Sequence, residues 1–92
     1  MDDTRSRVTS TTSRDGSLDE RDLAYAIAFK VFELRRAAGL SQSELAARAG
    51  MKQGHVSRLE SAKSTPTLPV LLRVAAGLGM TLTVNFTPEE RQ

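Results

Sequence analysis

Residues 40–60, with the sequence LSQSELAARAGMKQGHVSRLE, constrain the fold more than any other stretch of this 92-residue chain. Ser41 can accept a hydrogen bond from the backbone N–H of Glu44, while the Glu44 side chain reaches back to the N–H of Ser41. This reciprocal capping box begins a helix. Gly50 readily takes the left-handed conformation that ends one. The stretch therefore predicts two short helices joined by a sharp turn.

The second of these helices has an apolar side and a polar side. Val56 and Leu59 are three residues apart, so they share the side that points inward. Ala46 and Ala49, on the first helix, are small enough to let the two helices cross closely. The polar side presents side chains of varied chemistry and one glycine: Lys52, Gln53, Gly54, His55, Ser57 and Arg58.

This pair of helices resembles the helix-turn-helix of the Cro/C1 repressor (Xre) family over about residues 31–78. The resemblance rests on five residues that stand in one register: Gln42, Ala46, Gly50, Val56 and Leu59. It implies an all-α fold, a compact Cro/C1-type domain of four to five helices, whose second motif helix enters the major groove of DNA. The chain departs from the family at Ala62, where the family often has glycine.

The resemblance assigns DNA contacts to the polar residues. It places Gln53, Gly54 and Arg58 at base-reading positions, where an amide can address adenine and a guanidinium can address guanine. It gives Gln42 a phosphate contact and a supporting role for Gln53. We expect the remaining contacts, to phosphate or to the groove wall, from Lys52, His55, Ser57 and Lys63. For each residue alone, the alternative is an exposed polar side chain without a role.

A long helix is predicted at about residues 18–38, before the motif. Ser17 and Glu20 can form a second capping box at its start, and Gly39 ends it. One apolar face is expected to pack on the helix-turn-helix, and it consists of Leu23, Ile27, Val31, Leu34 and Ala38. A second apolar face, about 150° around the helix, consists of Tyr25, Ala28, Phe29 and Phe32. This second face meets a second subunit or a different protein, unless the remaining helices cover both faces.

Residues 80–86, MTLTVNF, alternate apolar and polar side chains and so predict a β-strand. Its apolar side, the expected dimerisation surface, consists of Met80, Leu82, Val84 and Phe86. A lone strand leaves its backbone groups unpaired. We therefore expect an antiparallel pair with the same strand of a second copy, about a two-fold axis. The alternative is a short extended tail packed on its own domain.

The remaining organisation is that of a single domain with polar ends. We expect the helical DNA-binding domain at 18–79, with helices at about 18–38, 42–49, 53–61 and 68–77. Thr67 caps the last helix, which Gly77 and Gly79 end. Residues 1–17 hold too little apolar surface to fold, so we expect a disordered tail: an arm that reaches DNA, a handle for a protease, or a segment without a role. Residues 87–92 are expected to form a polar tail.

Charge is distributed unevenly along the chain, whose net charge is +2. Residues 1–20 carry more acidic than basic side chains, whereas the stretch from Lys30 to Arg73 holds eight basic residues and three acidic ones. Excess positive charge over the helix-turn-helix is what a phosphate-binding surface requires. The alternative is a solvated basic face of the kind that many domains have.

Composition argues against catalysis. The chain has no cysteine, which excludes a disulfide framework, a thiolate nucleophile and a zinc ribbon. His55 is its single histidine, and Ser57 lies about 200° away around the helix, so the two cannot pair as base and nucleophile. We expect no enzyme, no metal site and no cofactor. No apolar run approaches the roughly 20 residues of a membrane span, and no signal-peptide core is present, so we expect a cytoplasmic protein.

These features predict a sequence-specific DNA-binding repressor that acts as a homodimer on a near-palindromic operator. The compact domain, the long first helix and the C-terminal LGMTLTVNF segment resemble antitoxins of the Hig and Hip toxin–antitoxin pairs. The run MKQ…VS, at residues 51–57, adds to the likeness with the Hip type. This resemblance implies a cognate toxin that the chain neutralises, autorepression of the shared operon, and a toxin contact at Tyr25, Phe29 and Phe32.

Two alternatives remain open. One is a stand-alone regulator of the same family without a toxin partner. The other is a protein-interaction adaptor whose helix-turn-helix does not bind DNA.

Overall fold

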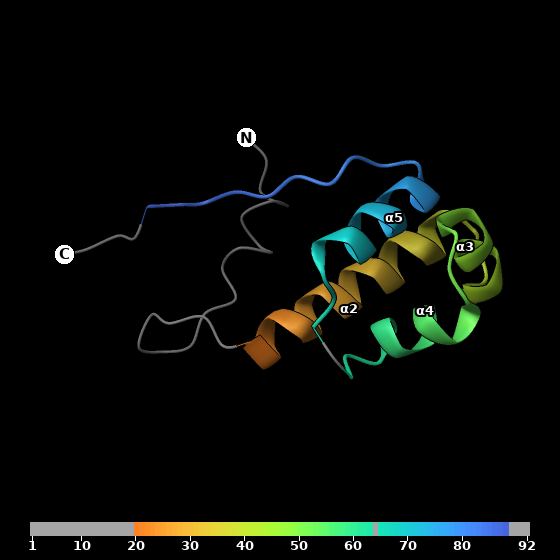
Figure 1. Ribbon diagram of the computed structural model, residues 1–92, viewed down its shortest axis with the longest axis horizontal. Coiled ribbons are helices and arrows are strands. Elements are labelled where there is room, and N and C mark those ends of the chain that lie inside the picture. Colours follow the sequence, from red (N-terminus) through yellow and green to blue (C-terminus); the bar gives the residue numbers. More distant parts are fainter. Residues whose placement is uncertain (1–19, 64, 89–92) are drawn as a thin grey trace.

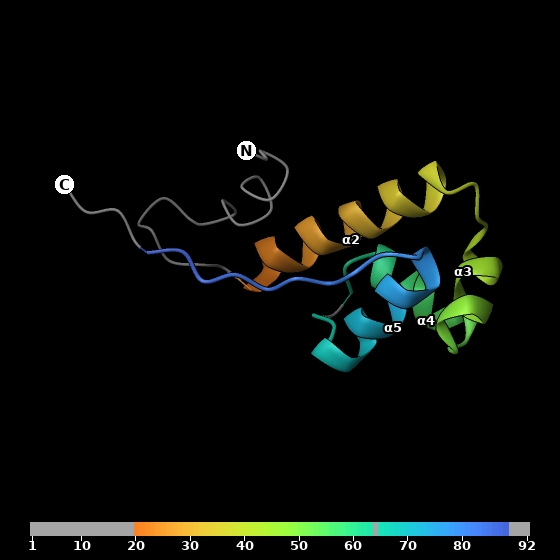
Figure 2. The same cartoon turned by 90° about the horizontal axis from the view of Figure 1, so that it is seen from above.

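Four helices make up the described part of the computed structural model, which describes residues 20–63 and 65–88. They are α2 (Glu20–Ala37), α3 (Gln42–Ala49), α4 (Gln53–Glu60) and α5 (Leu68–Leu78). α3 packs against α4 and α5, and α2 lies across α4 and α5 (Figures 1 and 2). No strand forms among the described residues, so the fold there is all-α. None of the described helices is both long and apolar enough to cross a membrane.

Some of the expected features lie outside the described residues. They are the tail at 1–17, the capping box at Ser17, the first two residues of the helix expected at 18–38, and the last four residues of the polar tail at 87–92.

Caps define both ends of α3, and the cap at its C-terminal end produces the sharp turn into α4. At the start of α3, the Glu44 N–H donates to Ser41 Oγ (3.0 Å) and the Ser41 N–H donates to Glu44 Oε1 (2.8 Å). The hydrogen bond from the Ser41 backbone is the main reason that the pKa of the Glu44 carboxyl lies below its usual value. At the end, Gly50 is left-handed (φ 71°), and the Met51 N–H donates to Ala46 O (2.9 Å). α3 is therefore confined to eight residues.

The core is small and centres on α3 and α4. Leu45 and Val56 are its fully buried side chains. The buried residues packed around them are Val31, Ala46, Leu59 and Val74. Partly buried side chains close the edges of this cluster: Ile27, Leu40, Met51, Val70 and Leu78.

Gly77 lets α5 approach α3 closely. A Cβ built at this position would lie 3.0 Å from Leu45 Cδ1 and 3.1 Å from Ala49 N, which is tighter than nine in ten real Cβ contacts. The prediction that Gly77 helps to end the helix is wrong, because it is a buried residue within α5. Gly79, which is left-handed (φ 73°), follows the last helical residue.

The side of α2 that faces the core differs from the predicted one. The buried residues of α2 are Ala24, Ala28, Val31 and Arg35. Ala28 was expected on the second apolar face but is only 4% exposed, and Ala38, expected in the core, is exposed. The core-facing line therefore runs between the two predicted faces. Small alanines at the contact let α2 lie close to its neighbours.

The aromatic face of α2, which we define as Tyr25, Phe29 and Phe32, stays open. These side chains are 59%, 61% and 38% exposed. The alternative that the remaining helices cover both apolar faces is therefore wrong for the helices that the structure describes. Phe32 has cationic neighbours, since its ring lies 5.5 Å from Arg35 Cζ and 5.6 Å from Arg36 Cζ. An aromatic ring with such neighbours can still present its other side to a partner.

Residues 80–88 form an extended segment that runs back past α5 toward the end of the molecule where α2 begins (Figures 1 and 2). The strand expected at 80–86 is absent from the described part of this single chain, because no neighbouring segment offers backbone partners. Met80, Val84 and Phe86 are 49%, 61% and 92% exposed, and Leu82 is half-buried. Phe86 in particular does not pack on its own domain.

We predict opposite effects for the same substitution at two helical glycines. Gly54→Ala is expected to stabilise the fold by about 0.5–1 kcal/mol, because alanine loses less backbone entropy in a helix. A Cβ there meets nothing within 4 Å. Gly77→Ala is expected to destabilise by about 1–2 kcal/mol, because the new methyl group overpacks the contact between α3 and α5. Urea denaturation measures both. Equal stabilisation by the two changes would show that α5 does not depend on this close approach.

Candidate nucleic-acid interface

The outward side of α4 is accessible along its length. Val56 is fully buried on the inner side. Because the helix turns by about 100° per residue, Gly54 and Arg58 lie on the crest opposite Val56. Gln53 and His55 then lie on the two flanks of that crest. All four outward residues are exposed, so the ridge from Gln53 to Arg58 is not tucked against the interior.

A chain of hydrogen bonds connects one flank of α4 to the rest of the domain. The Gln53 amide donates through Nε2 to Gln42 Oε1 (2.8 Å), and Gln42 donates through Nε2 to Glu60 Oε1 (3.1 Å). Glu60 accepts two further hydrogen bonds from Arg35, from Nε (2.7 Å) and from Nη2 (2.9 Å). Arg35 also donates through Nη1 to Leu40 O (2.9 Å). The network thus joins α2, α3 and α4.

The ion pair at the base of this network is buried. The side chains of Arg35 and Glu60 are 10% and 6% exposed. The hydrogen bond to Glu60 is the largest contribution that raises the pKa of Arg35, and it outweighs the opposing effect of burial. Two parallel N–H···O bonds between a guanidinium and a carboxylate set both distance and orientation. Glu60, at the end of α4, is therefore held to α2 in one geometry.

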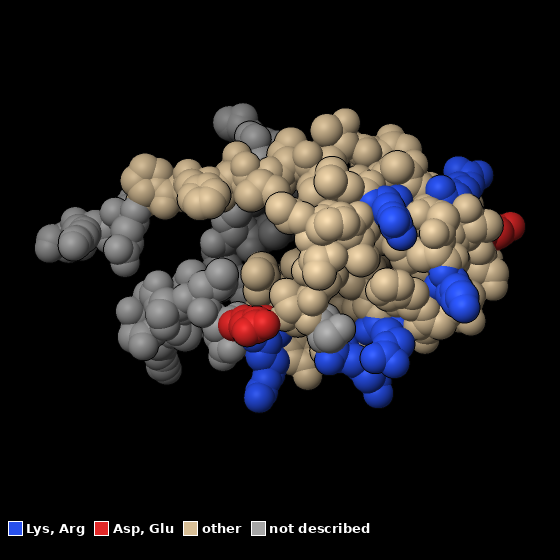
Figure 3. All heavy atoms as spheres, viewed as in Figure 1, with Lys and Arg blue, Asp and Glu red and all other residues tan. Residues whose placement is uncertain are grey.

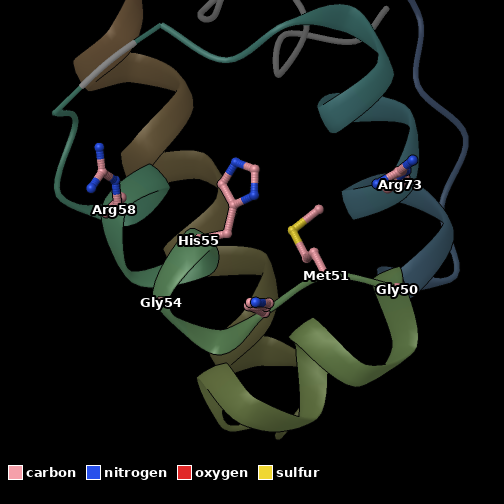
Figure 4. A pocket seen from close by; sticks show the side chains of 7 residues that line it. Gly50, Met51, Gly54, His55, Arg58 and Arg73 are labelled. Carbon is pink, nitrogen blue, oxygen red and sulfur yellow. The ribbon is translucent and has the colours of Figure 1, made fainter.

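An open hollow of about 580 Å³ lies along the other flank of α4, next to α5 (Figure 4). Its lining combines the turn, α4 and one residue of α5: Gly50, Met51, Lys52, Gly54, His55, Arg58 and Arg73. Arg73 was not among the expected site residues. Its signal in the sequence is a basic residue in an otherwise uncharged helix, LPVLLRVAAGL. Nothing in the sequence places that residue beside α4.

The predicted DNA-binding residues fall into two groups in the structure. Gln42 and Gln53 are hydrogen-bonded on one flank, and the second group lines the hollow: Lys52, Gly54, His55 and Arg58. Ser57 is half-buried, and its carbonyl accepts from Ser61 Oγ (2.6 Å). Their roles in DNA binding stay predictions.

Lys63 is exposed in the segment that follows α4. Ala62, just before it, is left-handed (φ 57°), and its N–H donates to Leu59 O (3.2 Å). A non-glycine residue in this region is strained, which explains why glycine suits the position. The exit from α4 keeps this turn with alanine, and Lys63 follows directly.

Positive charge gathers around α4. In the space-filling view, Lys and Arg side chains lie over α4 and the adjoining parts of α3 and α5, whereas residues 80–88 carry no charge (Figure 3). Among residues 20–63 and 65–88, no three His, Cys, Asp or Glu side chains come together as metal ligands. The chemistry that this surface offers is hydrogen bonding and attraction of anions.

Comparisons with known proteins agree with this geometry. A family model described as helix-turn-helix matches residues 31–85. An uncharacterized HTH-type transcriptional regulator of Haemophilus influenzae is 34% identical over 65 residues, which are 71% of this chain and 66% of that protein. The uncharacterized HTH-type transcriptional regulator y4dJ of Sinorhizobium fredii is 33% identical over 69 residues, 75% of this chain and 90% of that protein. No solved structure matches the chain significantly.

We predict that replacing one member of the Arg35–Glu60 ion pair costs more stability than replacing both members together. Glu60→Leu is expected to cost about 3 kcal/mol of stability, because it leaves the Arg35 guanidinium buried without its anion. The double variant Arg35→Met/Glu60→Leu is expected to recover most of this loss, since two apolar side chains can pack in the same space. Urea denaturation of the two variants measures the difference. A single variant that loses less than about 1 kcal/mol would mean that the pair behaves like an exposed one.

Proposed function

The chain belongs to the helix-turn-helix family of DNA-binding transcriptional regulators, with a Cro/C1-type domain, and we propose that it represses transcription by occupying an operator as a homodimer. To read an operator sequence, a helix-turn-helix protein needs a helix that enters the major groove and a few side chains that reach base edges. α4 offers such a helix, because its outward side is exposed while Val56 and Leu59 hold its inner side in the core.

The observation that carries this proposal is the orientation of the Gln53 amide. A carboxylate only accepts hydrogen bonds, so Glu60 turns the NH₂ group of Gln42 toward itself. The carbonyl of Gln42 then faces Gln53 and accepts one of its two amide hydrogens. Gln53 keeps its carbonyl oxygen and its second N–H. These are the acceptor and donor that adenine N6 and N7 require.

Gly54 and Arg58 complete the reading surface. Arg58 is exposed on the crest of α4, and its guanidinium can address guanine O6 and N7. Gly54, between Gln53 and Arg58, has no side chain, and the space where a Cβ would stand is empty. A base pair can therefore approach the backbone of α4 at this point.

The apolar surface that one chain leaves exposed supports the homodimer. The Met80 N–H donates to Ala75 O (2.8 Å), but the extended residues after it pair with no strand among the described residues, and the apolar side chains of residues 80–86 alternate. Pairing with the same segment of a second copy would satisfy their backbone groups and cover Met80, Leu82, Val84 and Phe86. A two-fold dimer would place two copies of α4 on two half-sites about one helical turn apart, or a multiple of that distance.

The finer part of the proposal is that the repressor is also an antitoxin. The aromatic face of α2 supports it, because three large aromatic side chains in a row on an exposed helix face are typical of a surface that binds another protein. In this role the chain would bind and neutralise a toxin from the same operon and repress that operon. A stand-alone regulator without a toxin partner is the second candidate.

We predict that Arg58→Ala lowers affinity for the best site by about 1–3 kcal/mol and relaxes one base position, because one bidentate base contact is lost. Selection of duplexes from a random pool, followed by anisotropy titration, measures both effects. The selected sites should contain two related half-sites. Lys63→Ala is the control, since loss of a phosphate contact weakens all sequences alike.

Equal weakening of selected and scrambled duplexes by Arg58→Ala would contradict base reading. A single unrepeated half-site would contradict the homodimer. Absence of binding to any duplex at low salt would leave the adaptor as the remaining function.

For the antitoxin role, we predict that replacing Phe29 and Phe32 together with serine abolishes capture of the protein encoded next to this chain and spares DNA binding. Both side chains are exposed, so the fold should tolerate the change. Co-expression with the neighbouring gene product, co-purification and a melting curve provide the measurement. Unchanged capture by the double variant rejects the aromatic face as the contact, and no capture by the unaltered chain supports the stand-alone regulator.

A further inference from the structure

The hollow beside α4 carries positive charge in addition to that of Arg58, which we assign to base reading. Four of its seven lining residues are basic: Lys52, His55, Arg58 and Arg73. No acidic side chain lines it. The hollow is open to solvent on the same outward side of the molecule as the crest of α4 (Figure 4). Such a site suits an anionic group that is part of the ligand of α4.

The flanks of α4 indicate which anion this is. A helix that lies in the major groove has a sugar–phosphate strand along each flank, because the groove is only about 12 Å wide. On one flank, the Gln53 side chain donates a hydrogen bond to Gln42, so that flank faces α3. The His55 flank faces the hollow, and Figure 4 shows Met51 between His55 on α4 and Arg73 on α5. A backbone phosphate on this second strand would therefore meet the hollow.

Arg73 is the lining residue that the helix-turn-helix itself does not supply. It lies on α5, it is exposed, and no ion pair holds it among residues 20–63 and 65–88. Met51, half-buried at the edge of the core, lies between it and His55 (Figure 4). A guanidinium there is free to bind a phosphate oxygen by two hydrogen bonds.

We propose that the hollow between α4 and α5 is a binding site for a backbone phosphate of the DNA, and that Arg73 supplies its charge from outside the helix-turn-helix. This rests on the proposed function, since the phosphate belongs to the duplex that α4 enters. Contacts to phosphate position the protein on the duplex and carry no sequence information directly. Arg73 therefore determines how deeply and at what angle α4 is seated, for every sequence alike.

The test is the salt dependence of binding to a duplex of arbitrary sequence. The logarithm of the binding constant falls with the logarithm of the salt concentration, with a slope of about −0.9 for each phosphate neutralised. Arg73→Gln is expected to make this slope shallower by about 0.9 per chain, so that affinity falls about 3.5-fold less between 50 and 200 mM salt. Fluorescence anisotropy at a series of salt concentrations measures the slope.

Two further variants make the result specific. Lys30→Gln removes one positive charge from α2, which lines no part of the hollow, and should leave the slope unchanged. Arg73→Lys keeps the charge and should keep the slope. Circular dichroism and a melting curve should be unaltered by Arg73→Gln, because the side chain is exposed.

A slope for Arg73→Gln equal to that of the unaltered chain overturns the phosphate site and leaves the proposed function standing. An equal loss in Arg73→Lys and Arg73→Gln, or in Lys30→Gln and Arg73→Gln, also overturns it. If the unaltered chain binds no duplex at low salt, the proposed function fails and the phosphate site fails with it.

Discussion

The buried ion pair between Arg35 and Glu60 is the interaction on which the presentation of α4 depends. An eight-residue helix has little stability of its own, and α4 buries only Val56 and Leu59. Those two contacts hold the helix in the core, but they leave its rotation and tilt less defined. The charge-assisted hydrogen bonds at Glu60 tie its last residue to α2, and Gln42 extends the same network to Gln53 at its first residue. Both ends of the helix are thus anchored through one carboxylate.

Small residues at the helix contacts limit how much apolar surface the core buries. Ala24 and Ala28 on α2, Ala46 on α3 and Gly77 on α5 let the helices approach closely, but each buries little apolar surface. A chain of 92 residues with such contacts has a modest core. Its largest apolar side chains are instead exposed, on the aromatic face and along residues 80–86. Exposure of this extent is unusual in a protein that works alone, and it is the physical reason to look for a second copy and a protein partner.

Local signals in the sequence were sufficient to predict the helix-turn-helix motif, but they were insufficient to predict which face of α2 is buried. Ser41, Glu44 and Gly50 act on the backbone within a few residues of themselves, so their hydrogen bonds and turn could be read directly. The buried line of α2 instead passes through Ala24, Ala28, Val31 and Arg35. Periodicity favours the larger side chains, and the small alanines and the arginine that actually meet the core carry no hydrophobic signal of that strength. The role of Gly77 was misread for the same reason, because a helix-ending glycine and a packing glycine look alike in sequence.

By itself, the sequence determined the helix boundaries around the turn, the polar outward side of α4 and the family to which the motif belongs, because each depends on neighbours three or four residues apart. Tertiary structure alone decided that Glu60 joins Arg35 to Gln42, that the aromatic face stays open, and that Arg73 reaches the hollow beside His55. Glu60 and Arg35, and likewise Arg73 and His55, lie far apart along the chain. Each pair comes together only because the four helices pack at close range, which Gly77 and the alanines allow.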